Sequence, residues 1–140
     1  MPLALNIRPY QSSDFSGVEA LWNEAFPNDP PWNQAEIAIP AKLSFQSELL
    51  FVAEDEGEVV GSIMGGYDGH RGWLYSLAVR ENALLGGIGT ALVRQAEDAL
   101  RALGCCKVNL QVRTANENVI RFYESLGYSV EDRVSLGRTI

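Results

Sequence analysis

The spacing of apolar residues in the first part of the chain predicts one strand and two helices. Leu3–Pro9 alternates between apolar and polar residues, which is typical of a short strand. From Asp14 to Phe26 the apolar side chains recur three or four residues apart, so we expect a helix that buries one stripe. Trp32–Phe45 has an irregular helical period that breaks at Pro40, which predicts a less regular second helix followed by a turn.

Three strands are expected in the middle of the chain. Leu49–Glu54 and Glu58–Tyr67 are apolar runs rich in β-branched residues, and the turn residues between them indicate a hairpin. A second turn that contains glycine leads into a further strand over Trp73–Arg80. These runs therefore predict three consecutive strands of one sheet.

The last part of the chain alternates between helix and strand patterns. The most regular helical period covers residues 88–103, and Gly104 can adopt the left-handed conformation that ends a helix. Lys107–Arg113 is expected to form a strand and Glu117–Leu126 a short helix. We expect Tyr128–Ile140 to add one or two closing strands.

This order of elements mixes hairpins with helical crossovers, so the sheet should contain both parallel and antiparallel pairs. The fold class is therefore α+β, or mixed α/β. A chain of 140 residues is the size of one ordinary domain, and neither repeats nor linkers divide it, so we expect residues 1–140 to form a single domain.

Charge and cysteine content narrow the possible partners and the compartment. Eleven basic and eighteen acidic residues give a net charge of -7, which repels nucleic-acid phosphates and favours a cationic substrate such as an amine. Cys105 and Cys106 are adjacent and have no distant partner, which suits a reducing cytoplasm. No secretion signal and no membrane-spanning run is present, so we expect a cytoplasmic protein without a membrane partner.

A glycine-rich turn at Gly86-Gly87-Ile88-Gly89-Thr90 precedes the most regular helix. The first N–H groups of a helix lack acceptors and lie at its positive end, so they can bind a phosphate group. Glycines at such a turn can also serve tight packing alone, and this alternative stays open. The turn lacks the Gly-Lys-Ser/Thr ending of a nucleoside-triphosphate loop. Leu92 stands at the position of the third glycine of a dinucleotide fingerprint, so both of these phosphate motifs are excluded.

Three segments in matching order and spacing resemble the GCN5-related N-acetyltransferase (GNAT) superfamily. They are Leu77-Ala78-Val79, then Gly87-Ile88-Gly89-Thr90-Ala91-Leu92, then Asn116 through Arg121-Phe122-Tyr123-Glu124-Ser125-Leu126-Gly127-Tyr128. The similarity covers the chain from about Leu50 onward and is greatest to small single-domain bacterial members. It implies a mixed, mostly antiparallel sheet flanked by helices. It also implies acetyl transfer from acetyl-coenzyme A to a primary amine of a peptide or small molecule, by direct attack on the thioester and without a metal.

The resemblance also assigns residues to the coenzyme. Tyr123 corresponds to a tyrosine that hydrogen-bonds the sulfur and acts as general acid, although a helical tyrosine can also be a core residue. Asn116 can contact the pantetheine arm or cap its helix. The pyrophosphate would lie on the N–H groups of Leu85, Gly86, Gly87, Ile88, Gly89 and Thr90, and the pantetheine arm along Leu77, Ala78 and Val79, where a bulge parts the strand from its neighbour.

The turn departs from the family pattern at three positions. Leu84 stands where an arginine or glutamine is usual, Leu85 replaces a common glycine, and Gly86 replaces a common arginine. The N–H groups remain, but charge near the pyrophosphate is lost. We therefore expect coenzyme A to bind more weakly than is normal for the family.

The base that deprotonates the amine is left open. Gln111 occupies the position of a glutamate found in some relatives and cannot act as a base. His70 has a suitable pKa range and is expected near the acceptor entrance, with Asp68 and Tyr75 as further candidates.

Five aromatic residues could line an acceptor pocket, and core packing is the competing explanation for the first two: Trp22, Phe26, Trp32, Tyr67 and Trp73. A non-catalytic acyl-coenzyme A sensor or interaction module is the alternative function, and a purely structural domain is a third. Both a monomer and a homodimer are compatible with the sequence.

Overall fold

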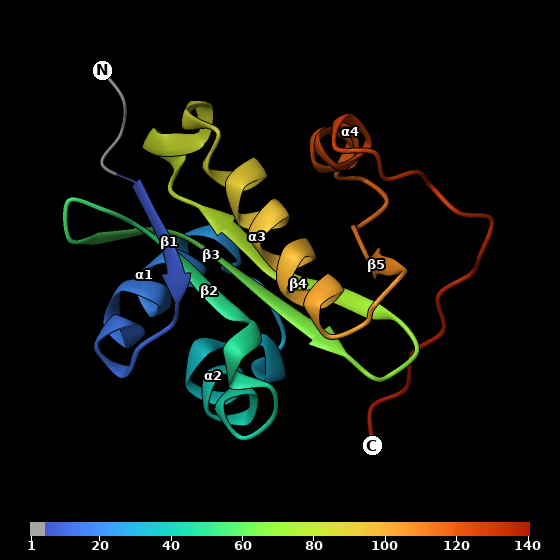
Figure 1. Cartoon of the computed structure of the whole chain (residues 1–140), viewed down its shortest axis with the longest axis horizontal. Coiled ribbons are helices and arrows are strands. Elements are labelled where there is room, and N and C mark those ends of the chain that lie inside the picture. Colours follow the sequence, from blue (N-terminus) through green and yellow to red (C-terminus); the bar gives the residue numbers. More distant parts are fainter. Residues whose placement is uncertain (1–4) are drawn as a thin grey trace.

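Two hydrophobic clusters on opposite faces of one sheet hold the fold together. Figure 1 shows the sheet and the helices that flank it. The computed structural model describes residues 5–140, apart from the side chains of Leu84 and Leu85. Its strands are β1 (Leu5–Pro9), β2 (Leu50–Asp55), β3 (Glu58–Tyr67), β4 (Gly72–Val79) and β5 (Val108–Leu110). Its α-helices are α1 (Phe15–Ala25), α2 (Ala35–Leu43), α3 (Ile88–Ala102) and α4 (Glu117–Ser125). Short 3-10 helices are η1 (Ser12–Asp14), η2 (Pro31–Asn33), η3 (Ser47–Leu49) and η4 (Glu81–Gly86).

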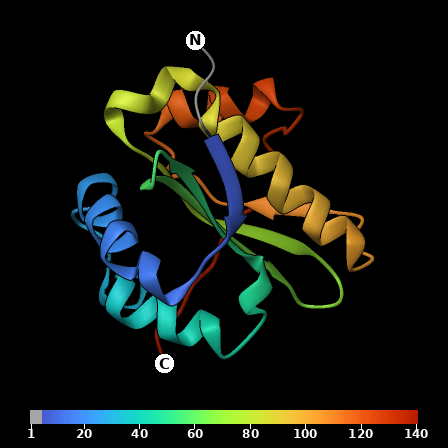
Figure 2. The same ribbon diagram turned by 60° about the vertical axis from the view of Figure 1, so that its left-hand side comes forward.

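The sheet follows the chain order β1-β2-β3-β4-β5. The first four strands are antiparallel, and β5 pairs with β4 in parallel after the crossover through α3. This is the mixed, mostly antiparallel sheet that the sequence predicted. Figure 2 shows α1 and α2 on one side of the sheet and α3 on the other.

Alternate residues of β2 supply the two clusters. Leu50 and Val52 pack with α1 and α2, whereas Phe51 and Ala53 pack with α3. All four side chains are at most 3% exposed, because β2 is covered by helices on both faces. The apolar stripe of α3 fills the second face with Ile88, Leu92, Val93, Ala96 and Leu100, and Gly104 ends the helix at φ +93°.

Two expectations from the sequence are wrong in detail, and part of a third cannot be compared with the structure. Helix α2 is not broken at Pro40 but continues through it to Leu43. Pro40 is exposed while Ile39 beside it is buried, so packing of the inner face holds the helix across the missing hydrogen bond. Strand β5 has three residues, Val108–Leu110, rather than the seven of Lys107–Arg113. Residues 3 and 4 of the expected first strand lie outside the described residues.

The closing strands expected over Tyr128–Ile140 are not formed. This segment contacts β5 and the residues on either side of it through side chains, Glu131 with Lys107 and Asn109, and Ser135 with Gln111. The charged run Glu131-Asp132-Arg133 leaves this segment without a continuous apolar face that could pack as a strand. Its apolar side chains are 75% to 108% exposed at Val130, Val134, Leu136 and Ile140.

A buried ion pair fixes the entry into α1. The Arg8 guanidinium donates two hydrogen bonds of 2.8 Å to the Asp14 carboxylate, which also accepts the Gln11 N–H at 2.8 Å. Asp14 is only 5% exposed. The hydrogen bond from Arg8 is the main reason that the pKa of Asp14 lies below its usual value of 3.8, against the opposing effect of burial.

We predict that Asp14→Asn lowers the free energy of unfolding at pH 7 by about 3 kcal/mol, because it removes the nearer of the two carboxylates that face Arg8 and leaves only Glu54, at 3.4 Å. Since the pKa of Asp14 is lowered by folding, its contribution is complete above about pH 4 and is lost as the pH falls below that value. Urea unfolding at pH 7 and pH 3 measures both effects.

The matched control is Asp98→Asn, because Asp98 pairs with Arg101 where both side chains are at least 70% exposed. It should change stability by less than about 0.5 kcal/mol. An Asp14→Asn deficit that is equal at pH 7 and pH 3 would contradict the role of this ion pair.

Candidate functional site

Strand β4 has two strand neighbours along its first part only. Gly72, Trp73 and Leu74 pair with Val108, Asn109 and Leu110 of β5, and the pairing ends there. From Tyr75 to Val79 the described residues pair β4 with β3 alone. One edge of β4 therefore offers backbone N–H and C=O groups to an extended ligand, as in the addition of a strand to a sheet.

A bulge lies at the point where the two strands part. Met64 pairs with Tyr75 and Ser62 pairs with Ala78, so Ile63 alone faces both Ser76 and Leu77. Ser76 adopts φ +54°, a left-handed conformation that is costly for a residue other than glycine. Such bulges redirect backbone groups. The expected bulge is therefore present beside Leu77, Ala78 and Val79.

The glycine turn places unpaired N–H groups at the start of α3. Gly87 precedes the helix with φ +75°, and the first intrahelical bond runs from the Ala91 N–H to the Gly87 carbonyl at 3.1 Å. No side chain caps this end. The N–H groups of Ile88, Gly89 and Thr90 therefore lie at the positive end of the helix without intrahelical acceptors, which makes an anion site.

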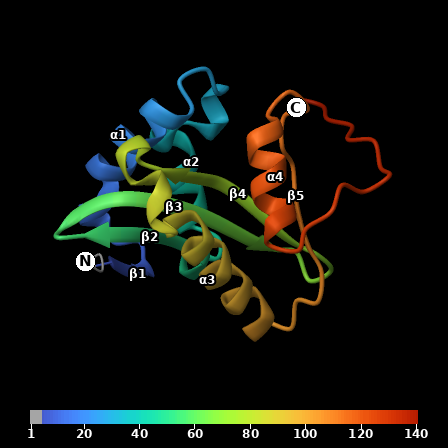
Figure 3. The ribbon, with the colours of Figure 1, turned by 90° about the horizontal axis from the view of Figure 1, so that it is seen from above.

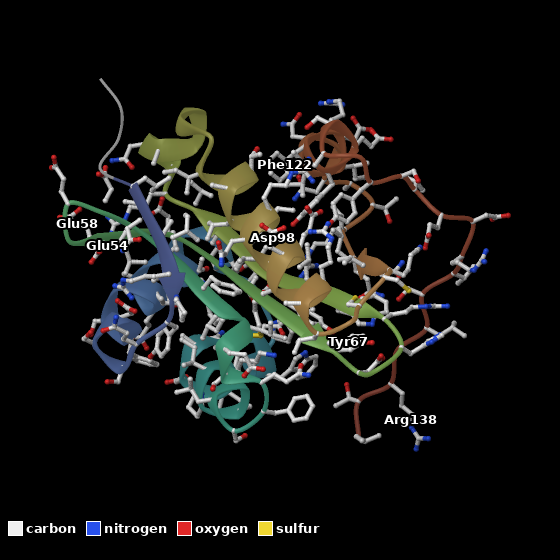
Figure 4. The ribbon with its side chains drawn as sticks, in the orientation of Figure 1. Glu54, Glu58, Tyr67, Asp98, Phe122 and Arg138 are labelled. Carbon is white, nitrogen blue, oxygen red and sulfur yellow. The ribbon has the colours of Figure 1, made fainter. Side chains whose placement is uncertain are left out.

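Helix α4 reaches this turn through an aromatic contact. A Cβ atom at Gly89 would lie 3.2 Å from Cζ of Phe122 and 3.8 Å from Cγ2 of Val79. The missing side chain thus lets α3, α4 and β4 meet at one place. Phe122 is marked in Figure 4, and Figure 3 shows α4 beside β5 at the end of the sheet.

Tyr123 follows Phe122 and is 7% exposed in the cluster on the α3 face. It makes edge contacts with the rings of Phe122 and Tyr128, at centroid distances of 5.1 Å and 5.5 Å. Burial raises its pKa to about 12, so the hydroxyl keeps its proton at neutral pH. Within the described part of the chain, no hydrogen bond occupies that hydroxyl. Tyr123 is thus a core residue that retains a free donor.

A polar brace that the sequence analysis missed holds α4 against α3. The Tyr128 hydroxyl donates to Glu97 at 2.7 Å, and Arg94 contacts both Glu97 and the Leu126 carbonyl. Tyr128 belongs to the quoted motif, but nothing in the sequence marked Glu97 as its partner. The brace fixes the end of α4 next to Tyr123.

Asn116 lies at the N-terminus of α4 as expected. Its side chain makes no capping hydrogen bond, while its backbone carbonyl accepts the Ile120 N–H at 3.2 Å. Of the two roles proposed from the sequence, side-chain capping is therefore not realised. The amide is left for another partner.

Two of the three candidate bases, Asp68 and His70, lie apart from the bulge. Asp68 and His70 belong to the turn before β4, so Leu77 is roughly 17 Å along the strand from its start at Gly72. The Asp68 carboxylate accepts the N–H groups of His70 and Arg71 at 2.8 Å, and these bonds lower its pKa. Tyr75 is nearest to the bulge, but burial raises the pKa of its hydroxyl. The structure therefore assigns the role of base to none of these three groups.

The aromatic residues fall on different sides of the sheet. Trp22 is 3% exposed and, with Phe26, belongs to the cluster under α1 and α2. Tyr67 packs on the α3 face instead. Trp32 is 56% exposed and Trp73 half-buried, so these two remain the accessible aromatic candidates for an acceptor.

A cavity of about 420 Å³ lies on the hairpin side of the turn and reaches Gly86. Asp55, Glu56 and Glu58 contribute carboxylates to its wall, and Arg80 uses its Nε to donate to the Val59 carbonyl. Three carboxylates repel a pyrophosphate, so this cavity does not suit the coenzyme.

Residues 5–140 contain no group of three or more His, Cys, Asp or Glu side chains arranged to hold a metal ion. In the same residues, no helix combines the length and the apolar character needed to cross a membrane.

Comparison with known proteins identifies the family. The pattern of the Acetyltransferase (GNAT) family matches residues 15–128. An acetyltransferase of Sodalis glossinidius is 47% identical over 132 residues, which are 94% of this chain and 92% of that protein. An acetyltransferase of Yersinia enterocolitica is 44% identical over 136 residues, 97% of this chain and 96% of that protein.

Solved structures agree on the fold. Ard1 from Thermoplasma volcanium superposes with a TM-score of 0.83 and 26% identity, over 92% of this chain and 85% of its own. The aminoglycoside N-acetyltransferase AAC(6')-Iy, solved in complex with CoA, gives a TM-score of 0.80 at 17% identity, over 99% and 97% of the two chains. The match over residues 15–128 and the near-complete alignment with acetyltransferases show that this chain belongs to the GNAT family and is an acetyltransferase.

Proposed function

We propose that this acetyltransferase takes acetyl-coenzyme A as co-substrate and transfers the acetyl group to a primary amine of a peptide or small molecule. The observation that carries the proposal is the convergence of three features. The unpaired N–H groups of the turn, the free edge of β4 and the Tyr123 helix meet around Gly89. The fold relative AAC(6')-Iy in complex with CoA supports the choice of coenzyme.

In this proposal the backbone binds the coenzyme. The pyrophosphate lies on the N–H groups of Leu85, Gly86, Gly87, Ile88, Gly89 and Thr90, and the pantetheine arm pairs with Leu77, Ala78 and Val79. Asn116 contributes its uncapped amide to the same arm. The positive end of α3 attracts the phosphates. Because the protein carries a net charge of -7, that local field must act against a repulsive background.

The chemistry follows from the same groups. A neutral amine attacks the thioester carbonyl, the carbonyl oxygen gains negative charge, and a backbone N–H of β4 stabilises it. The C–S bond then breaks and the nitrogen loses a proton, which balances the thiol that is released. The pKa of Tyr123, about 12, exceeds that of a thiol, ~8.5. Tyr123 therefore acts by hydrogen bonding to the sulfur as charge develops there, in the general-acid position.

An assay of free thiol release with a panel of amines tests this function. Peptides, polyamines, amino acids and aminoglycosides are offered in parallel, and acetylated products are identified by mass spectrometry. We expect transfer to at least one class. Coenzyme A binding without transfer to any amine would favour an acyl-coenzyme A-binding module instead.

Tyr123→Phe should lower kcat by roughly a hundredfold, because the hydrogen bond to the departing sulfur is lost. The affinity for acetyl-coenzyme A, measured by calorimetry, should stay within about twofold, since the ring packing is kept. Tyr128→Phe is the comparison variant, because it removes the hydroxyl that braces α4 through Glu97 but not the proposed donor to sulfur, and it should lower kcat less than Tyr123→Phe does. Equal kcat values for Tyr123→Phe and the wild type would remove the assignment.

Leu84→Arg should tighten coenzyme A binding several-fold, by about 1 kcal/mol, because it returns a cation to the pyrophosphate end. Leu84→Met is the uncharged control. The dissociation constant from calorimetry should recover its wild-type value as salt is added, since the gain is electrostatic. If Leu84→Arg leaves the dissociation constant of coenzyme A unchanged, the N–H groups of the turn are sufficient to bind the pyrophosphate without a side-chain cation.

A further inference from the structure

Ser62 and Trp22 connect α1 to the bulge of β4 through buried hydrogen bonds. The Trp22 indole Nε1–H donates to the Ser62 hydroxyl oxygen at 2.7 Å, and this hydroxyl donates in turn to the Ser76 carbonyl at 3.1 Å. Ser62 is 0% exposed and Trp22 is 3% exposed. The three residues come from α1, β3 and β4, so the contact joins the helix layer to both strands beneath it.

The strand ladder does not account for this arrangement. Ser62 faces Ala78 in the register, yet its side chain reaches back to the carbonyl of Ser76, one of the two bulged residues. Ser76 is held at φ +54° without being a glycine. A conformation of this kind costs about 1 kcal/mol or more and persists only where the surroundings impose it. The Ser62 hydroxyl supplies such a constraint.

The geometry of the peptide unit carries the constraint to the reacting edge. No peptide bond in the described residues is cis, so the carbonyl of Ser76 and the N–H of Leu77 point in opposite directions. Because the carbonyl is directed at the Ser62 hydroxyl, on the α1 side of β3, the N–H of Leu77 is directed away from β3 and from α1. Away from β3 lies the edge of β4 where pairing with β5 has ended.

We infer that Ser62, itself held by Trp22, is a positioning residue that aims the Leu77 N–H at the thioester oxygen. The inference rests on the proposed function. It identifies Leu77 as the oxyanion donor and explains why a serine occurs in the fully buried part of β3. The hydroxyl does not touch the substrate, and it acts through the Ser76–Leu77 peptide.

The test compares Ser62→Thr with Ser62→Val. Both variants add the same bulk, and only Thr keeps the hydroxyl. Misaligned donors weaken stabilisation of the oxyanion, so kcat of Ser62→Val should fall roughly tenfold below that of Ser62→Thr. The dissociation constant of free coenzyme A should be the same for both, because the pyrophosphate turn is untouched. A general loss of structure would change both quantities together.

A second readout does not depend on activity. The amide ¹H–¹⁵N resonance of Leu77 should shift in Ser62→Val and stay near its wild-type position in Ser62→Thr. This separates the inference from the proposed function, since wild-type protein that transfers to no amine would defeat the function alone. Should the added methyl group prevent folding, Ser62→Ala replaces Ser62→Val and the wild type replaces Ser62→Thr.

Adding Ser76→Gly to Ser62→Val should restore part of kcat, because glycine adopts a positive φ without the constraint. A Ser62→Val protein with the kcat and the Leu77 resonance of Ser62→Thr would overturn the inference.

Discussion

Strand β4 must remain part of the sheet and still leave one backbone edge free. Pairing with β3 runs along its length, whereas pairing with β5 ends at Leu74 and Leu110. The edge beyond that point would be a liability in most proteins, because unpaired N–H and C=O groups attract other strands. Here α3 and α4 meet the end of β4 at Gly89, and the proposed coenzyme site makes use of the incomplete pairing.

The pattern of the sequence is sufficient for most of the fold. The sequence predicted all four α-helices and all five strands, with β5 too long, because most of these elements bury one regular face or a continuous apolar run. The prediction of strands after Tyr128 was wrong, since the apolar residues there have no matching backbone partner on the three-residue β5. The break of α2 expected at Pro40 was wrong, because the burial of Ile39 outweighs the low helix propensity of proline. The spacing of residues alone does not reveal which effect is larger.

The sequence predicted the backbone features of the candidate site but not its buried side-chain contacts. The glycine turn, the bulge and the position of Tyr123 follow from short motifs, and their roles toward a coenzyme remain predictions. Trp22 was correctly expected in the core, but its hydrogen bond to Ser62 was not foreseen. The two residues are forty positions apart in the sequence, and their meeting depends on how α1 packs over β3. Contacts of this kind follow from tertiary packing and leave no local pattern.

Burial of β2 on both faces has a consequence for folding specificity. In a strand with one solvent-exposed face, a one-residue slip in register would expose apolar side chains. The alternation of polar and apolar residues alone then fixes the register with the neighbouring strand. Leu50–Ala53 is apolar on both faces, and polarity gives no such guidance there. Alignment must come from shape and from the bulge where Ala53 pairs with Gly61 while Glu54 pairs with Val59. That irregularity occurs once along the pair, so it sets a unique register for the central hairpin.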